Sequence, residues 1–392
     1  MRLAHLADLH LGYRQYHRLN PAGINQREAD VAHAFRSAMD ALIAAKPDIV
    51  VIAGDVFHSV RPTNQAIIFG FRELQRLREA LPRAPIVMIA GNHDTPRATE
   101  TGSILRLFQE LGVDVVTDQA EWLEYDELGI DVLAAPHQAV VAEERPSLRR
   151  RNRVPHEVLV AHGEVEGLFP LDRWWVEPGG ALLDSRELEQ GRWSYVALGH
   201  YHVQREVRPG IWYAGSLDFV TSNPWGELVE QRKVGVKSKG WLLVDLESGT
   251  VTRQPIESPR EVVDLKPISA QSLSAAELDA EIAGRLKAVR RGIDDKVVRL
   301  VVYDCPRAMV RDLDHAAIRS AKAAALHLHL DFRRPEIHRT VGVGAPGRKT
   351  LPEVLREYLT GRPLPERVPR ERFVAEGVAL LEGATQDPDR AD

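Results

Sequence analysis

Five short apolar runs in the first 255 residues each end in a cluster of Asp, Asn, His, Gly or Ser. These runs are residues 2–7, 48–53, 85–90, 158–161 and 195–198. Their length and their content of Val, Ile and Leu favour strands that are buried on both faces. Apolar positions at helical spacing in residues 35–45 and 65–80 predict helices that cover those strands. The pattern therefore predicts an α/β fold with polar residues gathered at strand ends.

Length, charge and cysteine content narrow the class of protein. A chain of 392 residues exceeds what one core usually supports, so two domains are expected. A net charge of −5 argues against unaided coating of DNA, so any nucleic-acid contact is expected to be local. The single cysteine, Cys305, is typical of a reducing cytosol. His5, Asp8 and His10 interrupt the opening segment, and no apolar run reaches about 18 residues, so a cytoplasmic protein without membrane spans is expected.

The sequence pattern changes after residue 256. Residues 257–340 read as a smaller α+β unit, in which Ser274 and Glu277 have the spacing of a helix-starting capping box. Residues 341–349 (VGVGAPGRK) are rich in Gly and predict a flexible linker. Residues 350–383 predict two short amphipathic helices, the first with a capping box at Thr350 and Glu353. An acidic, disordered tail is expected over residues 384–392.

The clusters at the strand ends supply metal-compatible side chains. In Asp8-x-His10 and His200-x-His202 the spacing of two places both side chains on one side of an extended segment, as a chelating pair requires. Mixed nitrogen and oxygen donors without thiolate favour Mn²⁺, Fe²⁺ or Zn²⁺. The number of donors exceeds the need of one tetrahedral ion. It predicts two divalent ions bridged by one carboxylate, which we expect to be Asp55.

Five motifs in a fixed order connect the chain to a known family. DLH, GDVFH, GNHD, AHG and GHYH resemble the signature of the calcineurin-like metallophosphoesterases. Within that superfamily, HLGYRQY, GDVFHSVRPT and YAGS resemble the nuclease subunit of the SbcCD type and its archaeal and eukaryotic counterparts in double-strand-break repair. The resemblance covers residues 1 to about 220. It implies a four-layer α/β/β/α sandwich with a smaller α+β capping domain that binds DNA, and a C-terminal helix pair.

The resemblance also implies roles for individual residues. It assigns two metal ions, most simply Mn²⁺, to the ligands Asp8, His10, Asp55, Asn92, His162, His200 and His202. His93 is implied as the catalytic residue that protonates the leaving oxygen, since histidine titrates near neutral pH. His58 is expected beside it, and Asp94 is expected to orient the His93 ring.

The family activity implied is 3′–5′ exonuclease action on duplex ends and endonuclease cleavage of single strands. DNA contacts are expected from Arg14, Arg61 and Arg97 near the rim of the site, with Tyr16 stacking on a base or ribose. Two stretches depart from the family pattern, residues 18–26 and the continuation of the YAGS motif into GSLDFVTSNPWGE. Both are expected near the DNA path.

Two interaction surfaces are also expected. The helix over residues 65–80 carries apolar residues on more than one face, and the family dimerises through this region, so Ile67, Ile68, Phe71 and Leu74 are expected at a homodimer interface. The C-terminal helices are expected to bind an SMC-like coiled-coil ATPase of the SbcC type.

Together these features predict a nucleoid-associated DNA nuclease. The alternatives are a phosphodiesterase or phosphatase acting on a nucleotide or other small molecule, and a weakly active DNA-end-binding scaffold.

Overall fold

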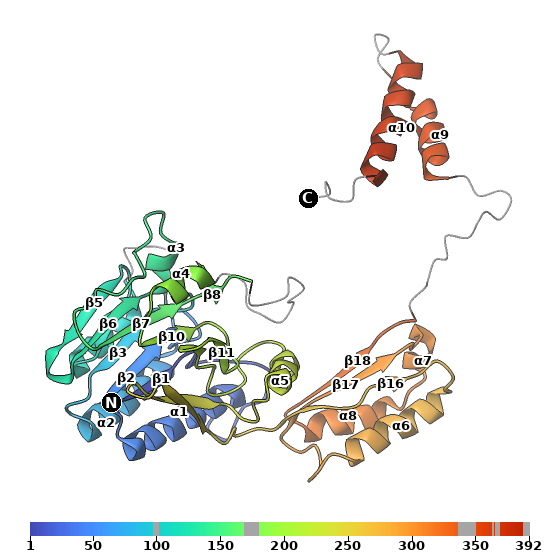
Figure 1. Cartoon of the computed structure of the whole chain (residues 1–392). Coiled ribbons are helices and arrows are strands. Elements are labelled where there is room, and N and C mark those ends of the chain that lie inside the picture. The colour runs from blue at the N-terminus through green and yellow to red at the C-terminus, as the bar shows by residue number, and fades with distance from the viewer. Residues whose placement is uncertain (97–101, 168–179, 336–349, 363, 365–368, 387–392) are drawn as a thin grey trace. The chain divides into compact units, whose positions relative to one another are not determined.

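The computed structural model describes residues 1–96, 102–167, 180–335, 350–362, 364 and 369–386. It divides into two compact units, Met1–Arg334 and Pro335–Asp392 (Figure 1). The predicted linker at residues 341–349 lies outside the described residues, as do Arg97 and residues 387–392 of the predicted tail. Among the described residues, we find no helix with the length and apolarity needed to span a membrane.

Two six-stranded sheets form the centre of the first unit. The first has the order β14-β13-β1-β2-β3-β4, with parallel pairing from β1 to β4. The second has the order β11-β12-β10-β7-β6-β5, with parallel pairing from β6 through β7 and β10 to β12. The strands of the first sheet are β1 (Arg2–Leu6), β2 (Ile49–Ala53), β3 (Ile86–Ile89), β4 (Asp114–Val116), β13 (Gly240–Asp245) and β14 (Thr250–Pro255). Those of the second are β5 (Glu121–Tyr125), β6 (Ile130–Ala135), β7 (His156–His162), β10 (Tyr195–Gly199), β11 (Arg205–Arg208) and β12 (Ile211–Tyr213).

Helices lie on the outer faces of the two sheets (Figure 1). The first sheet is covered by α1 (Gln26–Ala45), α2 (Asn64–Ala80) and the 3₁₀ helix η2 (Ile104–Leu111). The short helices α3 (His137–Val141) and α4 (Ser185–Gln190) accompany the second sheet, and η3 (Asp126–Leu128), β8 (Glu164–Val165) and β9 (Leu182–Leu183) complete this region. The predicted α/β/β/α sandwich is confirmed. Helix α1 begins earlier than its apolar pattern suggests because the Asn25 side chain caps it by accepting from Arg27 N.

The strands are buried on both faces because alternate residues serve different cores. In β2, Val50 and Ile52 pack in the core beneath α1 and α2. Ile49 and Val51, one residue out of step, pack between the two sheets. This period of two explains why the strands read as unbroken apolar runs in the sequence.

The cap is a small sheet with helices. Strand β17 (Val297–Tyr303) pairs in parallel with β15 (Val262–Asp264), β16 (Ile268–Ser269) and β18 (His327–Phe332). Its helices are α6 (Ala275–Lys287), α7 (Arg307–Arg311) and α8 (His315–Ala324). The capping box of Ser274 and Glu277 is present at the start of α6. The cap clusters with the sandwich as one compact unit.

Contacts between distant segments hold the cap against the sandwich. Tyr16 stacks on His327 with ring centroids 4.0 Å apart. The guanidinium of Arg18, in the unusual stretch at residues 18–26, donates to the carbonyl oxygens of Ala323 and Ala325 at 2.9 and 2.7 Å. Trp225, in helix α5 (Pro224–Lys233), donates from Nε1 to the carbonyl oxygen of Val263. Both stretches that depart from the family pattern therefore contribute to this junction.

The junction is expected to weaken in mild acid because of His327. Burial lowers the pKa of His327 to about 4, and nearby His329 and Lys322 act in the same direction. The folded state holds the ring neutral, whereas the unfolded chain takes up a proton near pH 6.5. The contribution of His327 to stability is therefore complete above pH 6.5 and is lost as the pH falls toward 4. The variant His327→Phe keeps an aromatic ring on Tyr16. Between pH 7.5 and pH 5, its Tm is expected to fall by about 2 °C less than the Tm of wild type. Equal losses in calorimetric scans of both chains would contradict this.

The second unit contains α9 (Leu351–Gly361) and α10 (Arg370–Gln386), which pack against each other. The capping box of Thr350 and Glu353 is present. Gly361 is the last residue of α9, and α10 continues three residues into the stretch that was expected to be disordered. Leu351, Val354 and Tyr358 of α9 remain exposed on this unit.

The packing of helix α2 shows that Leu74 was wrongly expected at the homodimer interface. Leu74 is fully buried in the core beneath the helix, so it is unavailable to a second copy. Ile67 and Phe71 are partly buried against the same core, whereas Ile68 is half-exposed. The wide apolar face of α2 is thus largely explained by its packing on the first sheet.

Candidate metal centre and active site

The expected metal ligands follow the carboxyl ends of parallel strands from both sheets. Asp8 and His10 follow β1, Asp55 follows β2, and Asn92 follows β3. His162 is the last residue of β7, and His200 and His202 follow β10. Because parallel strands end at the same edge of a sheet, the fold gathers all seven side chains in one place.

The backbone at four of these ligands adopts an unfavourable conformation. Asp8, His10, Asp55 and His200 have φ values of 52°, 45°, 51° and 100°. Non-glycine residues rarely adopt positive φ, and such strain gathers at functional sites. Tight turns after the strands aim these side chains toward one another instead of along the sheet.

The donors form two buried groups. Asp8, His10 and His202 form one, and Asp55, His162 and His200 form the other, with the ligand atoms in each group within 4.8 Å of one another. In the first group, His10 Nε2 lies 3.1 Å from His202 Nε2. Asn92 joins the second, because its Oδ1 lies 3.0 Å from His162 Nε2 and 3.2 Å from His200 Nδ1.

Asp55 lies between the two groups. Its Oδ2 is 3.3 Å from His162 Nε2 and 3.8 Å from His10 Nε2. Its other oxygen, Oδ1, accepts from the backbone N–H of His93 at 2.9 Å. This position supports the expected bridging role of Asp55.

The residues present fit divalent metal ions. Asp8 Oδ1 accepts from His200 N at 2.8 Å, but Asp8 Oδ2 is buried and has no hydrogen-bond partner among the described residues. A buried carboxylate oxygen without a partner is costly unless a cation satisfies it. The nitrogen and oxygen donor set suits a borderline metal.

The charges of the ligands are coupled. Burial raises the pKa of Asp8 to about 6, against the opposing effects of His202 and His162. For Asp55, burial is outweighed by His162 and His10, which hold its pKa well below the usual range. Burial likewise opposes a charge on His162, but Asp55 raises the pKa of that ring to about 9. The Asp55 carboxyl group is therefore ionised at neutral pH, as a metal ligand must be.

Gly54 shows how little room the site leaves. Its φ of +89° suits glycine, and a Cβ there would lie 2.8 Å from His162 Cγ and 2.9 Å from the Cα of Gly91. Any larger residue would displace a metal ligand or its supporting loop.

His93 stands beside the metal donors. Its ring lies 4.8 Å from that of His10 and stacks on that of His58 at 5.2 Å, centroid to centroid. His93 Nδ1 hydrogen-bonds to the carbonyl oxygen of His58 at 2.8 Å, so Nδ1 carries the proton. The orientation of His93 therefore comes from the backbone of His58.

Asp94 has a different task from the one expected. Its carboxylate accepts from the backbone N–H groups of Val56, Phe57 and Gly91 at 2.9 to 3.1 Å. It braces the loops that carry Asp55 and Asn92, and the expected orientation of the His93 ring by Asp94 is corrected. Burial, together with the charge of Asp55, raises the pKa of Asp94 to about 7.

The sequence comparisons agree with this geometry. Residues 1–219 match the family model of the calcineurin-like phosphoesterases. The chain belongs to this family. It is a metal-dependent phosphoesterase, as the sequence motifs predicted.

Several curated relatives of this phosphoesterase are archaeal proteins named DNA double-strand break repair protein Mre11. That of Methanocaldococcus jannaschii is 26% identical over 271 residues, which cover 66% of this chain and 66% of the relative. That of Saccharolobus solfataricus is 24% identical over 375 residues, covering 92% and 90%. That of Methanopyrus kandleri is 26% identical over 424 residues, covering 100% and 85%.

The residues expected to contact DNA have different surroundings in this phosphoesterase. Arg61 is exposed, and Arg14 is half-exposed while its Nε pairs with Glu28 at 2.7 Å. Tyr16 stacks on His327 in the cap junction, and its expected stacking on a base or ribose stays a prediction. Arg97 lies outside the described residues.

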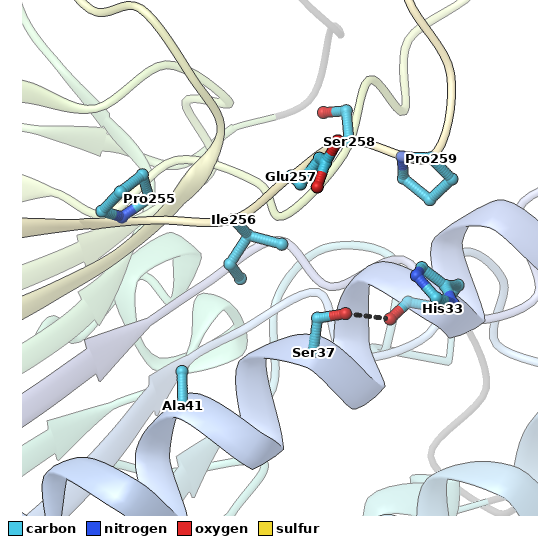
Figure 2. A pocket seen from close by; sticks show the side chains of 8 residues that line it. All are labelled: His33, Ser37, Ala41, Pro255, Ile256, Glu257, Ser258 and Pro259. Carbon is cyan, nitrogen blue, oxygen red and sulfur yellow. Dashed lines mark hydrogen bonds between the residues drawn. The ribbon is translucent and has the colours of Figure 1, made fainter.

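A cavity elsewhere on the phosphoesterase is separate from this chemistry. A cavity of about 400 Å³ lies between α1 and residues 255–259. Figure 2 shows its lining, with His33 and Ser37 of α1 facing residues 255–259. None of the seven metal donors lines it. A small-molecule site there would lack the metals that define the family.

Sequence reasoning missed two buried residues near the metal donors of the phosphoesterase. Glu227 and Lys239 lie close to His202, and both are at most 3% exposed. No motif marks either residue, and single buried charges of this kind become visible only in the folded chain.

Proposed function

We propose that this phosphoesterase is a DNA nuclease of double-strand-break repair, acting as a 3′–5′ exonuclease on duplex ends and as an endonuclease on single strands. The observation that carries the proposal is the convergence of seven metal donors with His93 placed beside them. The similarity to archaeal Mre11 proteins over most of the chain supports DNA as the substrate. We expect it to act in the cytoplasm at the nucleoid.

The residues divide the chemistry between them. Two divalent ions, for which we propose Mn²⁺, would be held by the seven donors and would supply Lewis-acid activation of water and of the phosphate. In its protonated, imidazolium form His93 donates the Nε2 proton to the leaving sugar oxygen and keeps the Nδ1 proton on the His58 carbonyl. His58 packs against His93 and keeps its ring in this orientation. Arg14 and Arg61 bind backbone phosphates at the rim.

The test compares two substrates with the purified protein and Mn²⁺. One is end-labelled duplex DNA, and the other is a chromogenic bis-phosphodiester. We expect loss of the DNA label, which His93→Ala and removal of metal by EDTA both abolish. Cleavage of the small diester with intact DNA would move the function to small phosphoesters. Unchanged DNA binding with no cleavage of either substrate would favour the scaffold.

The C-terminal helices are proposed to bind an SMC-like coiled-coil ATPase. Leu351, Val354 and Tyr358 are exposed apolar side chains at helical spacing, as helix-in-groove recognition requires. Deleting residues 350–392 is expected to leave metal-dependent cleavage unchanged and to abolish co-purification with the ATPase. The double substitution V354D/Y358D should have the same effect, and E357A serves as its matched control. ATPase binding that survives the deletion would refute this assignment.

A homodimer through α2 also remains a proposal. Ile68 is its best-placed anchor because half of its side chain is exposed. Sedimentation analysis of Ile68→Asp against wild type tests it directly, since a charge at the centre of an apolar interface is expected to produce monomers.

A further inference from the structure

The ligand His202 differs from His162 in what lies behind its ring. His162 Nδ1 hydrogen-bonds to the carbonyl oxygen of Ala53 at 2.8 Å, and its Nε2 points to the other donors. His202 Nε2 points to His10, and its Nδ1 lies 3.9 Å from Glu227 Oε1. Metal-binding histidines are commonly oriented by a carbonyl or carboxylate on the nitrogen away from the metal. Glu227 occupies that place for His202.

Glu227 is held rigidly. It lies in the first turn of α5, where its Oε1 accepts from Thr221 Oγ1 at 2.6 Å and from Thr221 N at 3.2 Å. Its Oε2 accepts from Lys239 Nζ. Trp225 on the same helix is tied to the cap through Val263. The carboxylate is therefore fixed in place before any metal binds.

Lys239 also contacts His202, through the backbone of that residue. Its Nζ donates to the carbonyl oxygen of His202 at 2.8 Å and to Ser216 Oγ at 2.9 Å. Ser216 belongs to the YAGS motif, and Ser216 N also donates to the carbonyl oxygen of His202, at 3.1 Å. One buried lysine thus connects the backbone of His202, the YAGS motif and the carboxylate behind the His202 ring.

We infer that Glu227 and Lys239 form a positioning pair that orients His202 as a metal ligand. A buried ion pair is weak evidence for stability alone, because desolvation offsets most of its attraction. The geometry points to a task for this pair beyond packing, since both members contact or face one ligand. The inference rests on the metal site proposed above.

The experiment measures Mn²⁺ binding by calorimetry and by electron paramagnetic resonance on the full chain. The variants are E227Q, K239M and the double variant E227Q/K239M. The matched control is E157Q, because Glu157 is also a fully buried carboxylate, held by Arg150 and the N–H groups of Asn152 and Arg153, at the start of β7. Single variants leave an unpaired buried group and are expected to melt at lower temperature than the double variant.

Wild type and E157Q are expected to bind two Mn²⁺ and to show the spectrum of a coupled pair. The double variant is expected to recover much of its Tm but to bind one of the two ions about 10- to 100-fold more weakly, with a mononuclear signal in its place. A double variant that recovers both stability and wild-type Mn²⁺ affinity would show that the pair is structural only. Wild type that binds no Mn²⁺ would overturn the proposed metal site, and the inference with it.

Discussion

Replacing His93 with alanine is expected to slow phosphodiester cleavage by about 10²- to 10⁴-fold, the usual contribution of a general acid. Binding of metal and DNA is expected to be unchanged. His93 groups with His10 and His58 in a cluster without a carboxylate, whereas the two groups that contain a carboxylate, Asp8 or Asp55, do not include His93. Its link to Asp55 runs through its backbone N–H, which alanine keeps. Single-turnover assays on end-labelled duplex DNA, with metal content determined in parallel, measure both effects.

His33→Ala is the matched control for this variant. His33 is exposed on α1 and lines the separate cavity of Figure 2. Its loss is expected to leave the rate at the wild-type level. Cleavage that persists in His93→Ala at more than a tenth of the wild-type rate would remove His93 from the role of leaving-group acid.

Asp55→Asn is expected to weaken both metal sites together and to reduce cleavage by about 10³-fold or more, since metal ions supply several kcal/mol of transition-state stabilisation. The carboxylate lies near donors of both groups, through His162 and His10. An amide has a single oxygen, so it cannot accept from His93 N and also bridge two ions.

Comparison of Asp55→Asn with Asp8→Asn tests whether Asp55 bridges two metal ions or binds only one. Asp8 belongs to one donor group only, so its replacement is expected to lower Mn²⁺ stoichiometry from about two to about one. Equilibrium dialysis of the two variants beside wild type gives the comparison. If Asp55→Asn lost a single ion, as Asp8→Asn should, Asp55 would be an ordinary ligand of one site.

The sequence by itself predicted the layers of the fold and the positions of the candidate metal donors. Alternating burial in β2 is encoded in its unbroken apolar run, and donors such as Asp8 and Asp55 lie within two residues of a strand end. Parallel strands end at one edge, so local patterns were sufficient to predict that the donors meet. The family motifs added the expected chemistry of His93.

Only the tertiary structure decided what surrounds these residues. It directed Asp94 to backbone N–H groups, stacked Tyr16 on His327 of the cap, and buried Leu74 beneath α2. It also brought Glu227 behind His202. Each of these contacts joins elements that are separate in the chain, and their side chains meet only when the layers pack. The periodicity of one segment shows which of its faces is buried but does not identify the element that packs against that face.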